Sequence, residues 1–166
     1  MPENQALHRA EQDKSEGKSP GTQAGEFVRE EIRHVREGKH GAVSAKQVIA
    51  IGLSKARRAG VKLGPPARGK TSSKIRKQAM REIRRGKTSR QKKASARRSR
   101  AISGVLRHEG HQAASHNALS RQAHRSAKRR GSASLHRAAL KAVRTKGPTG
   151  LRAAARKAAR TRSRNG

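Results

Sequence analysis

The distribution of charge along the chain limits its possible folds more than any other feature. Residues 41–166 hold 36 Lys and Arg but only two acids, whereas residues 1–40 hold seven Lys and Arg against eight acids. The net charge of +33 therefore belongs almost entirely to the later part of the chain. A segment with this balance repels itself in any compact arrangement and attracts polyanions.

The supply of large apolar side chains is too small to offset that repulsion. Leu, Ile, Val and Phe make up 22 of the 166 residues, below the roughly 20% at which a highly charged chain is expected to be disordered. Burial of so little surface does not offset the conformational entropy lost on folding. We therefore expect a mostly α protein with extensive disorder, in which a small helical hairpin is followed by a string of short basic helices without a single core.

Glycine and proline divide the chain into three expected parts. Residues 1–25 are predicted to be a flexible polar tail, and residues 26–63 a helical hairpin head. Residues 64–166 form a basic tail rich in Lys, Arg, Ala and Ser, disordered or transiently helical. Helix breakers separate its candidate helices, which run over roughly 73–85, 89–108, 117–130, 133–145 and 150–163.

The head carries the clearest helix signals. Aliphatic residues at i, i+4 and i+7 predict a helix over 26–37. Ser44 and Gln47 have the spacing of a capping box that begins a second helix, and Gly60 provides its end. Similar signals in the tail are a capping box over 88–91, and N-caps at Asn117 and Thr149. The two head helices are expected to close around Phe27, Val28, Ile32, Val35, Val48, Ile49 and Leu53.

Clusters of adjacent cations recur throughout the basic part of the chain. Each cation that replaces a condensed counterion on a phosphate contributes free energy through ion release. We therefore expect non-specific nucleic-acid binding through the phosphate backbone. The candidate contact residues are Arg57, Arg58, Arg68, Lys70, Arg84, Arg85, Lys92, Lys93, Arg97, Arg98, Arg100, Lys128, Arg129, Arg130, Arg156 and Lys157.

Signals for base recognition are weak. The chain has no Trp or Tyr and one Phe, so it offers no stacking platform for unpaired bases. Residues 47–58 could occupy a major groove as the second helix of a hairpin, but packing of their aliphatic side chains on the first helix is the preferred interpretation. Residues 66–70 resemble the Arg-Gly-Arg core of a minor-groove hook, although Ala67 and Lys70 depart from it and a linker is preferred.

No arrangement of residues indicates catalysis, a metal site or a cofactor. Nucleophile and base need a fixed geometry, which a chain with little core does not provide. The sequence has no Cys. His108 and His111 could share a helical face, but Gly110 lies between them and no carboxylate pair completes a site. We expect a non-enzymatic protein.

The expected partner is DNA, with RNA or the ribosome as the first alternative. A second alternative is a stress-related interaction module, in which residues 26–63 bind a protein and the basic tail only solubilises it. No apolar run is long enough for membrane insertion. A DNA-binding role implies a cytoplasmic location at the nucleoid.

Residues 38–60 begin with Gly-Lys-His-Gly and end with Lys-Gln-Val-Ile-Ala-Ile-Gly-Leu-Ser-Lys-Ala-Arg-Arg-Ala-Gly. With this motif, residues 18–63 resemble an uncharacterised bacterial family of small basic proteins. That family has a Gly-Lys-x-Gly motif followed by Lys-Gln-Ala-Ile-Ala-Ile-Ala-Leu-Ser-x-Ala-Arg-x-Ala-Gly. The resemblance implies a bacterial source and supports a boundary after the head. The tail is similar in composition to histone H1-like bacterial proteins. Val48 and Gly52 replace Ala, and the matching residues are Gly38, Lys39, Gly41, Lys46, Gln47, Ile49, Ala50, Ile51, Leu53, Ser54, Ala56, Arg57, Ala59 and Gly60.

Overall fold

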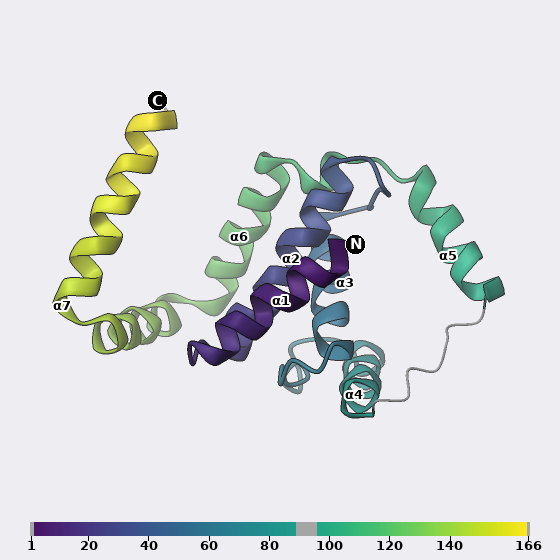
Figure 1. Ribbon diagram of the computed structural model, residues 1–166, viewed down its shortest axis with the longest axis horizontal. Coiled ribbons are helices and arrows are strands. Elements are labelled where there is room, and N and C mark those ends of the chain that lie inside the picture. The colour runs from purple at the N-terminus through teal and green to yellow at the C-terminus, as the bar shows by residue number, and fades with distance from the viewer. Residues whose placement is uncertain (1, 89–95, 166) are drawn as a thin grey trace. The chain divides into compact units, whose positions relative to one another are not determined.

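The computed structural model describes residues 2–88 and 96–165, and these residues are mainly helical (Figure 1). Within those ranges no strand occurs. The chain divides into two compact units, Met1–Ser120 and Arg121–Gly166. The helices are α1 (Pro2–Ser15), α2 (Pro20–Arg36), α3 (Ala45–Arg58), α4 (Ser73–Lys87), α5 (Ala96–His108), the 3-10 helix η1 (Gln112–Ala114), α6 (His116–Arg130) and α7 (Ser132–Asn165).

The expected mostly α class without a single core is confirmed, whereas the extensive disorder is not. Helices occupy most of the described part of residues 64–166. Ala, Lys and Arg, which dominate this part, have high intrinsic helix propensity. Composition predicted the absence of a large core correctly, but a helix needs no core to satisfy its own backbone hydrogen bonds.

The flexible tail expected for residues 1–25 is replaced by α1 and the first turns of α2. Ser19 is the N-cap of α2, because its side chain accepts the Thr22 N–H, and Pro20 occupies the first helical position. Proline is favoured there, since the N–H that it lacks would have no helical partner. The Ser-Pro pair therefore starts a helix instead of marking a loop.

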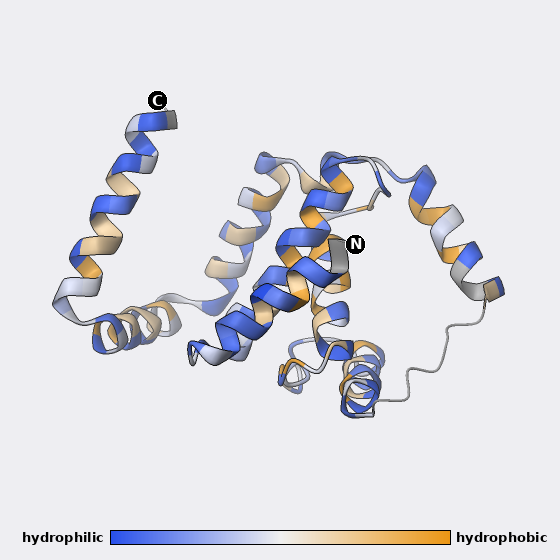
Figure 2. Ribbon diagram, viewed as in Figure 1, coloured by the Kyte–Doolittle hydropathy of each residue, from blue (hydrophilic) through white to orange (hydrophobic). Residues whose placement is uncertain are grey.

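Helices α1, α2 and α3 share a small apolar cluster. α1 lies alongside α2 (Figure 1), and apolar residues gather where these helices face one another (Figure 2). Phe27 is 5% exposed at the centre of the cluster. Most of its neighbours are alanines, whose short side chains let the helix backbones approach closely. The cluster contains Ala6, Ala10, Ala24, Phe27 and Ala56, flanked by Leu53, Val61 and Leu63.

The crossing of α2 and α3 depends on Gly52. A Cβ atom built on Gly52 would lie 2.6 Å from the Cα atom of Val28 and 2.9 Å from its Cγ2 atom. Real Cβ atoms do not approach other atoms this closely. The absence of a Cβ atom at this position therefore permits the contact between the two helices.

The ends of α3 follow the expected signals. The Gln47 N–H donates to the Ser44 side chain over 3.3 Å, and the Gln47 side chain accepts the Val43 N–H over 2.9 Å. The reciprocal bond of the capping box thus falls one residue earlier than in its usual form. Gly60, with φ of 89°, ends the helix.

A second apolar cluster forms where α2 and α3 meet η1. Val35, Val48 and Ala114 are fully buried in it, and Ala113 is 7% exposed. Arg36 Nε donates to the carbonyl oxygen of Ala114 over 2.9 Å, which fixes η1 against α2. None of the seven residues expected in the hairpin core is exposed: Phe27, Val35 and Val48 are buried, and Val28, Ile32, Ile49 and Leu53 are partly buried.

The C-terminal end of α5 is attached to the turn after α2. The Gly41 N–H donates to the Leu106 carbonyl oxygen over 2.7 Å, and the Ala42 N–H donates to that of Gly110 over 3.1 Å. A Cβ atom on Gly41 would lie 1.8 Å from the Glu109 carbonyl oxygen. Any residue with a side chain at position 41 would therefore prevent this contact with the end of α5.

Serine residues begin two of the basic helices. The Ser72 side chain accepts the Ile75 N–H at the start of α4, and the Ser115 side chain accepts the Ala118 N–H at the start of α6. Asn117, expected as the N-cap, lies inside α6, because Ser115 already occupies the capping position. The capping box over 88–91 extends outside the described residues.

The second unit holds the end of α6 and all of α7. Gly131, with φ of 76°, separates the two helices. Gly147, with φ of 62° and ψ of 178°, interrupts α7 directly before Pro148, so that α7 consists of two helical halves. Thr149, expected as the N-cap of the last helix, lies within α7. Among residues 2–88 and 96–165, no helix combines the length and the apolar character needed to cross a bilayer.

Candidate nucleic-acid interface

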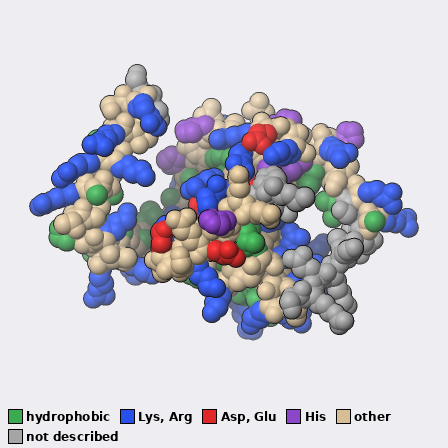
Figure 3. Space-filling view, in the orientation of Figure 1, with side chains coloured by type: hydrophobic (Ala, Val, Ile, Leu, Met, Phe, Trp, Pro, Cys, Tyr) green, Lys and Arg blue, Asp and Glu red, His purple; other side chains and the backbone are tan. Residues whose placement is uncertain are grey.

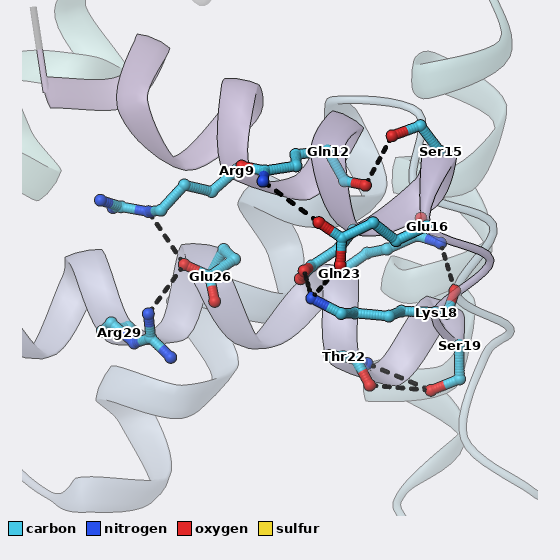
Figure 4. A network of polar contacts seen from close by, with 11 residues as sticks. Arg9, Gln12, Ser15, Glu16, Lys18, Ser19, Thr22, Gln23, Glu26 and Arg29 are labelled. Carbon is cyan, nitrogen blue, oxygen red and sulfur yellow. Dashed lines mark hydrogen bonds and ion pairs between the residues drawn. The ribbon is translucent and has the colours of Figure 1, made fainter. Parts of the chain in front are cut away.

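Three acids of the N-terminal unit, Asp13, Glu16 and Glu26, pair with cations at the contact of α1 with α2 and in the turn between them (Figure 4). Glu26 Oε2 lies 2.9 Å from Arg9 Nε and 3.1 Å from Arg29 Nη1. Lys18 Nζ lies 2.7 Å from both Asp13 and Glu16. The Arg9–Glu26 pair joins α1 to α2, and Lys18 in the turn between these helices binds Asp13 at the end of α1.

The pKa shifts of the exposed groups follow from the same pairs. A hydrogen bond to Asp13, and then one to Glu16, raise the pKa of Lys18. The hydrogen bond to Lys18 lowers the pKa of Glu16. A hydrogen bond to Lys39 likewise lowers the pKa of Glu37.

A more deeply buried group of charges lies between α2 and α3. Glu31 is 1% exposed and contacts His40 and Lys55. His34, 6% exposed, lies on the same helix. Burial lowers the pKa of His34, and the charges of Lys55 and Lys39 act in the same direction. This group is part of the interior of the N-terminal unit.

Arg57, one of the residues expected to contact phosphate, is buried. Only 9% of its side chain is exposed, and its Nη1 atom lies 3.6 Å from Oε2 of Glu82 on α4. Ser54 and Gln78 also donate to Oε1 of Glu82. Arg57 therefore joins α3 to α4, and its partner on another helix keeps it from the exposed surface expected of a contact residue.

The other expected contact residues of the first unit are exposed where the structure describes them. Arg58 keeps one bond to the protein, from its Nε atom to the Ser54 carbonyl oxygen over 3.3 Å. Arg68 and Lys70 flank Gly69 in a turn, as expected for a linker. Lys92 and Lys93 lie outside the described residues, as does the Arg98 side chain. The exposed residues are Arg58, Arg68, Lys70, Arg84, Arg85, Arg97 and Arg100.

Unlike the N-terminal unit, the C-terminal unit has no acidic side chain to pair with its cations. Residues 121–166 contain 15 Lys and Arg and no acid, so no ion pair can form within the unit except at a chain end. All 15 of these cations are exposed. Figure 3 shows Lys and Arg side chains projecting from α7, whereas the acidic side chains visible in that view lie on the N-terminal unit.

The helical spacing arranges these cations in stripes. Residues at i and i+4, followed by i+7 or i+8, lie on one face of a helix, and neighbours in such a stripe are about 4.5–6 Å apart along the axis. α6 carries one stripe, and each half of α7 carries another. The stripes are Arg121, Arg125 and Lys128; Arg137, Lys141 and Arg144; and Arg152, Arg156 and Arg160.

Adjacent cations in the sequence mark only part of this surface. Lys128, Arg129, Arg130, Arg156 and Lys157 are exposed, as their expected role requires. The residues missed are single cations spaced three or four positions apart, which a search for adjacent cations passes over. The signal that could have found them is helical periodicity in Arg121, Arg125, Arg137, Lys141, Arg144, Arg152 and Arg160.

Comparison with known proteins gives one match. Residues 13–68 match a family of unknown function (DUF6496). The matched segment begins near the end of α1 and includes α2 and α3. It contains the segment on which the family resemblance was based. No curated protein and no solved structure matches the chain.

Proposed function

We propose that the chain is a non-enzymatic DNA-binding protein that holds duplex DNA through the phosphate backbone with little sequence specificity. The observation that supports the proposal is the surface of residues 121–166, in which 15 exposed cations face no acid of their own. Neutralisation by phosphates relieves the repulsion among them and releases counterions from the DNA. This mode of binding suits a cytoplasmic protein of the nucleoid.

The helices favour duplex DNA over the other polyanions. Single-strand binding depends on aromatic stacking, and Phe27, the chain's one aromatic residue other than histidine, is 5% exposed in the core. The major groove of B-form DNA admits an α-helix, whereas that of A-form RNA is too deep and narrow. Short helices with cations on one face can therefore follow phosphates along a B-form groove.

DNA binding should also stabilise the helices α6 and α7. Like charges at i, i+3 and i+4 destabilise an isolated helix. Phosphates that neutralise the stripes remove this penalty, so DNA binding and helix stability in α6 and α7 are coupled. We expect the circular-dichroism helix signal to increase when duplex DNA is added.

A salt titration tests the proposal. The nine cations of the three stripes predict a slope of log Kobs against log salt of about −8, at −0.9 for each phosphate contacted. The measurement uses the full chain and a 30-base-pair duplex of mixed sequence, by fluorescence anisotropy. A slope shallower than about −3 would contradict binding through the stripes.

Competition separates DNA from RNA. At a fixed salt concentration, unlabelled B-form DNA should displace the labelled duplex at a lower concentration than an A-form RNA duplex of the same sequence. If the RNA duplex competes more strongly, the protein is an RNA binder. Equal competition would show that charge alone, without groove shape, determines binding.

A further inference from the structure

A buried cluster of one carboxylate and two imidazoles lies where α2, the turn after it and α3 meet. Glu31 and His34 are at i and i+3 on α2, and His40 is in the turn. The Glu31 carboxylate is 1% exposed. Ligand atoms of the three residues all lie within 4.8 Å of one another. The side chains come from a helix and a turn held by Gly38 and Gly41, so their positions are well defined by the fold.

His34 supplies the second imidazole of the cluster. Its Nε2 atom is buried and has no hydrogen-bond partner. The Oε1 atom of Glu30 is 3.9 Å away, beyond hydrogen-bonding distance. A buried polar atom without a partner costs free energy and needs an explanation, such as an ion that the atom can bind.

His40 is oriented as a metal ligand would be. Its Nδ1 atom lies 3.0 Å from the carbonyl oxygen of Gly41, to which Nδ1–H can donate. Its Nε2 atom faces Glu31 and lies 2.7 Å from Oε1. A backbone carbonyl that holds one ring nitrogen and directs the other towards an ion is the usual outer contact of a metal-binding histidine.

We propose that Glu31, His34 and His40 bind a zinc ion through one carboxylate oxygen and two imidazole nitrogens, with water in the fourth position. Zinc bonds of about 2.0–2.2 Å place neighbouring ligand atoms about 3.3 Å apart in a tetrahedron. The present separations, from 2.7 Å between His40 and Glu31 to 4.8 Å at most, bracket this value. Small side-chain rotations are sufficient to form the site, and His40, 18% exposed, provides access from solvent.

Lys55 on α3 should lower the affinity of this site for zinc. Its Nζ atom lies 2.9 Å from Oε2 of Glu31 and its side chain is 23% exposed. In the metal-free chain the ammonium compensates the buried carboxylate, which would otherwise be strongly destabilising. A bound cation at Oε1 repels that ammonium, so the lysine limits zinc affinity. No metal site was expected from the sequence, because the signal for this one, the Glu-x-x-His spacing on α2, lies far along the chain from the tail pair His108 and His111.

This inference does not rest on the proposed function. None of the three ligands is an exposed cation of the candidate interface, and zinc binding and DNA binding are measured separately. The experiment uses the full chain after treatment with a chelator and its removal. Isothermal titration with zinc chloride gives stoichiometry and affinity, and the absorption of bound Co²⁺ reports tetrahedral coordination.

The expected result is one zinc ion per chain. Substitution His40→Gln should weaken zinc binding at least 100-fold, and Glu31→Gln should do the same. The matched control replaces two exposed histidines of the second unit, His124→Gln with His136→Gln, and should bind zinc as the original chain does. Circular dichroism of each variant checks that its helix content is retained.

Lys55→Met provides a test that does not depend on removing a ligand. It should raise zinc affinity at least tenfold, because the repulsion disappears while all three ligands remain. The proposal is overturned if the original chain takes up less than a tenth of an equivalent of zinc. It is also overturned if His40→Gln binds zinc unchanged, if the exposed-histidine control abolishes binding, or if Lys55→Met weakens binding in a variant that keeps its helix content.

Discussion

Replacement of Gly52 by alanine should open the contact between α2 and α3. The added Cβ atom would lie 2.6 Å from the Cα atom and 2.9 Å from the backbone nitrogen of Val28. Backbone atoms cannot rotate away, so the helices must separate by about 1 Å to restore an ordinary contact distance of about 3.5 Å. A gap of that size weakens the dispersion contacts along the whole crossing.

The expected magnitude combines two opposing effects. Alanine in place of glycine stabilises a helix interior by about 1 kcal/mol. Overpacking of a close contact costs about 1–3 kcal/mol, and the upper end applies because the obstruction is backbone. Gly52→Ala should therefore destabilise the N-terminal unit by about 1–2 kcal/mol in sum.

Gly25→Ala is the matched control. Gly25 lies inside α2, and a Cβ atom built there meets nothing within 4 Å. This variant should gain up to about 1 kcal/mol from helix propensity alone. Native-state amide exchange in α2 and α3, measured by NMR, gives the opening free energy of each variant. Equal exchange rates in Gly52→Ala and Gly25→Ala would refute the proposed close contact.

Two further substitutions test other contacts. Glu82→Gln leaves the Arg57 guanidinium buried without a counter-charge and should destabilise the packing of α4 on α3 by about 3–5 kcal/mol. The expected result is faster amide exchange in α4. Unchanged exchange would mean that the ion pair has no structural role. Ser115→Ala removes the N-cap of α6 and should weaken its first turn by about 1 kcal/mol, seen as faster exchange of the Ala118 amide, whereas Asn117→Ala should leave that exchange unchanged.

Local signals in the sequence predicted the helices well. Aliphatic spacing, the Ser44 cap and the Gly60 stop correctly marked α2 and α3, and helix breakers separated the tail helices. These signals act within a few residues, so a single sequence contains them. The start of α2 was not predicted, because a Ser-Pro pair among polar residues also fits a loop, although proline after a capping serine is favoured at the first helical position.

Contacts between distant segments could not be predicted in the same way. α1 packs through alanines such as Ala6 and Ala10, which a count of large apolar residues omits. Arg57 lies among other cations in the sequence and so resembles a surface residue. It is buried because the fold brings it next to Glu82, which is 25 residues further along the chain. The Glu31 cluster likewise depends on a turn that returns His40 to α2, which no local pattern specifies.

The central claim is that exposed, unpaired cations bind DNA while acid-paired cations stabilise the fold. The most direct test compares two triple substitutions with the same loss of charge. One replaces the stripe residues Arg137, Lys141 and Arg144 by glutamine. The other replaces Lys18, Arg29 and Lys39 by glutamine. The side chains of these three residues pair with acids and are 45%, 70% and 46% exposed, respectively.

The measurement is the slope of log Kobs against log salt for duplex DNA. The stripe variant should lose about 2.7 from the magnitude of the slope, at about 0.9 for each phosphate contact, and the paired-cation variant should keep the original slope. Equal losses in both variants would show that only net charge matters, and a larger loss in the paired-cation variant would place the DNA on the N-terminal unit. Either result would contradict the division of roles between the two sets of cations.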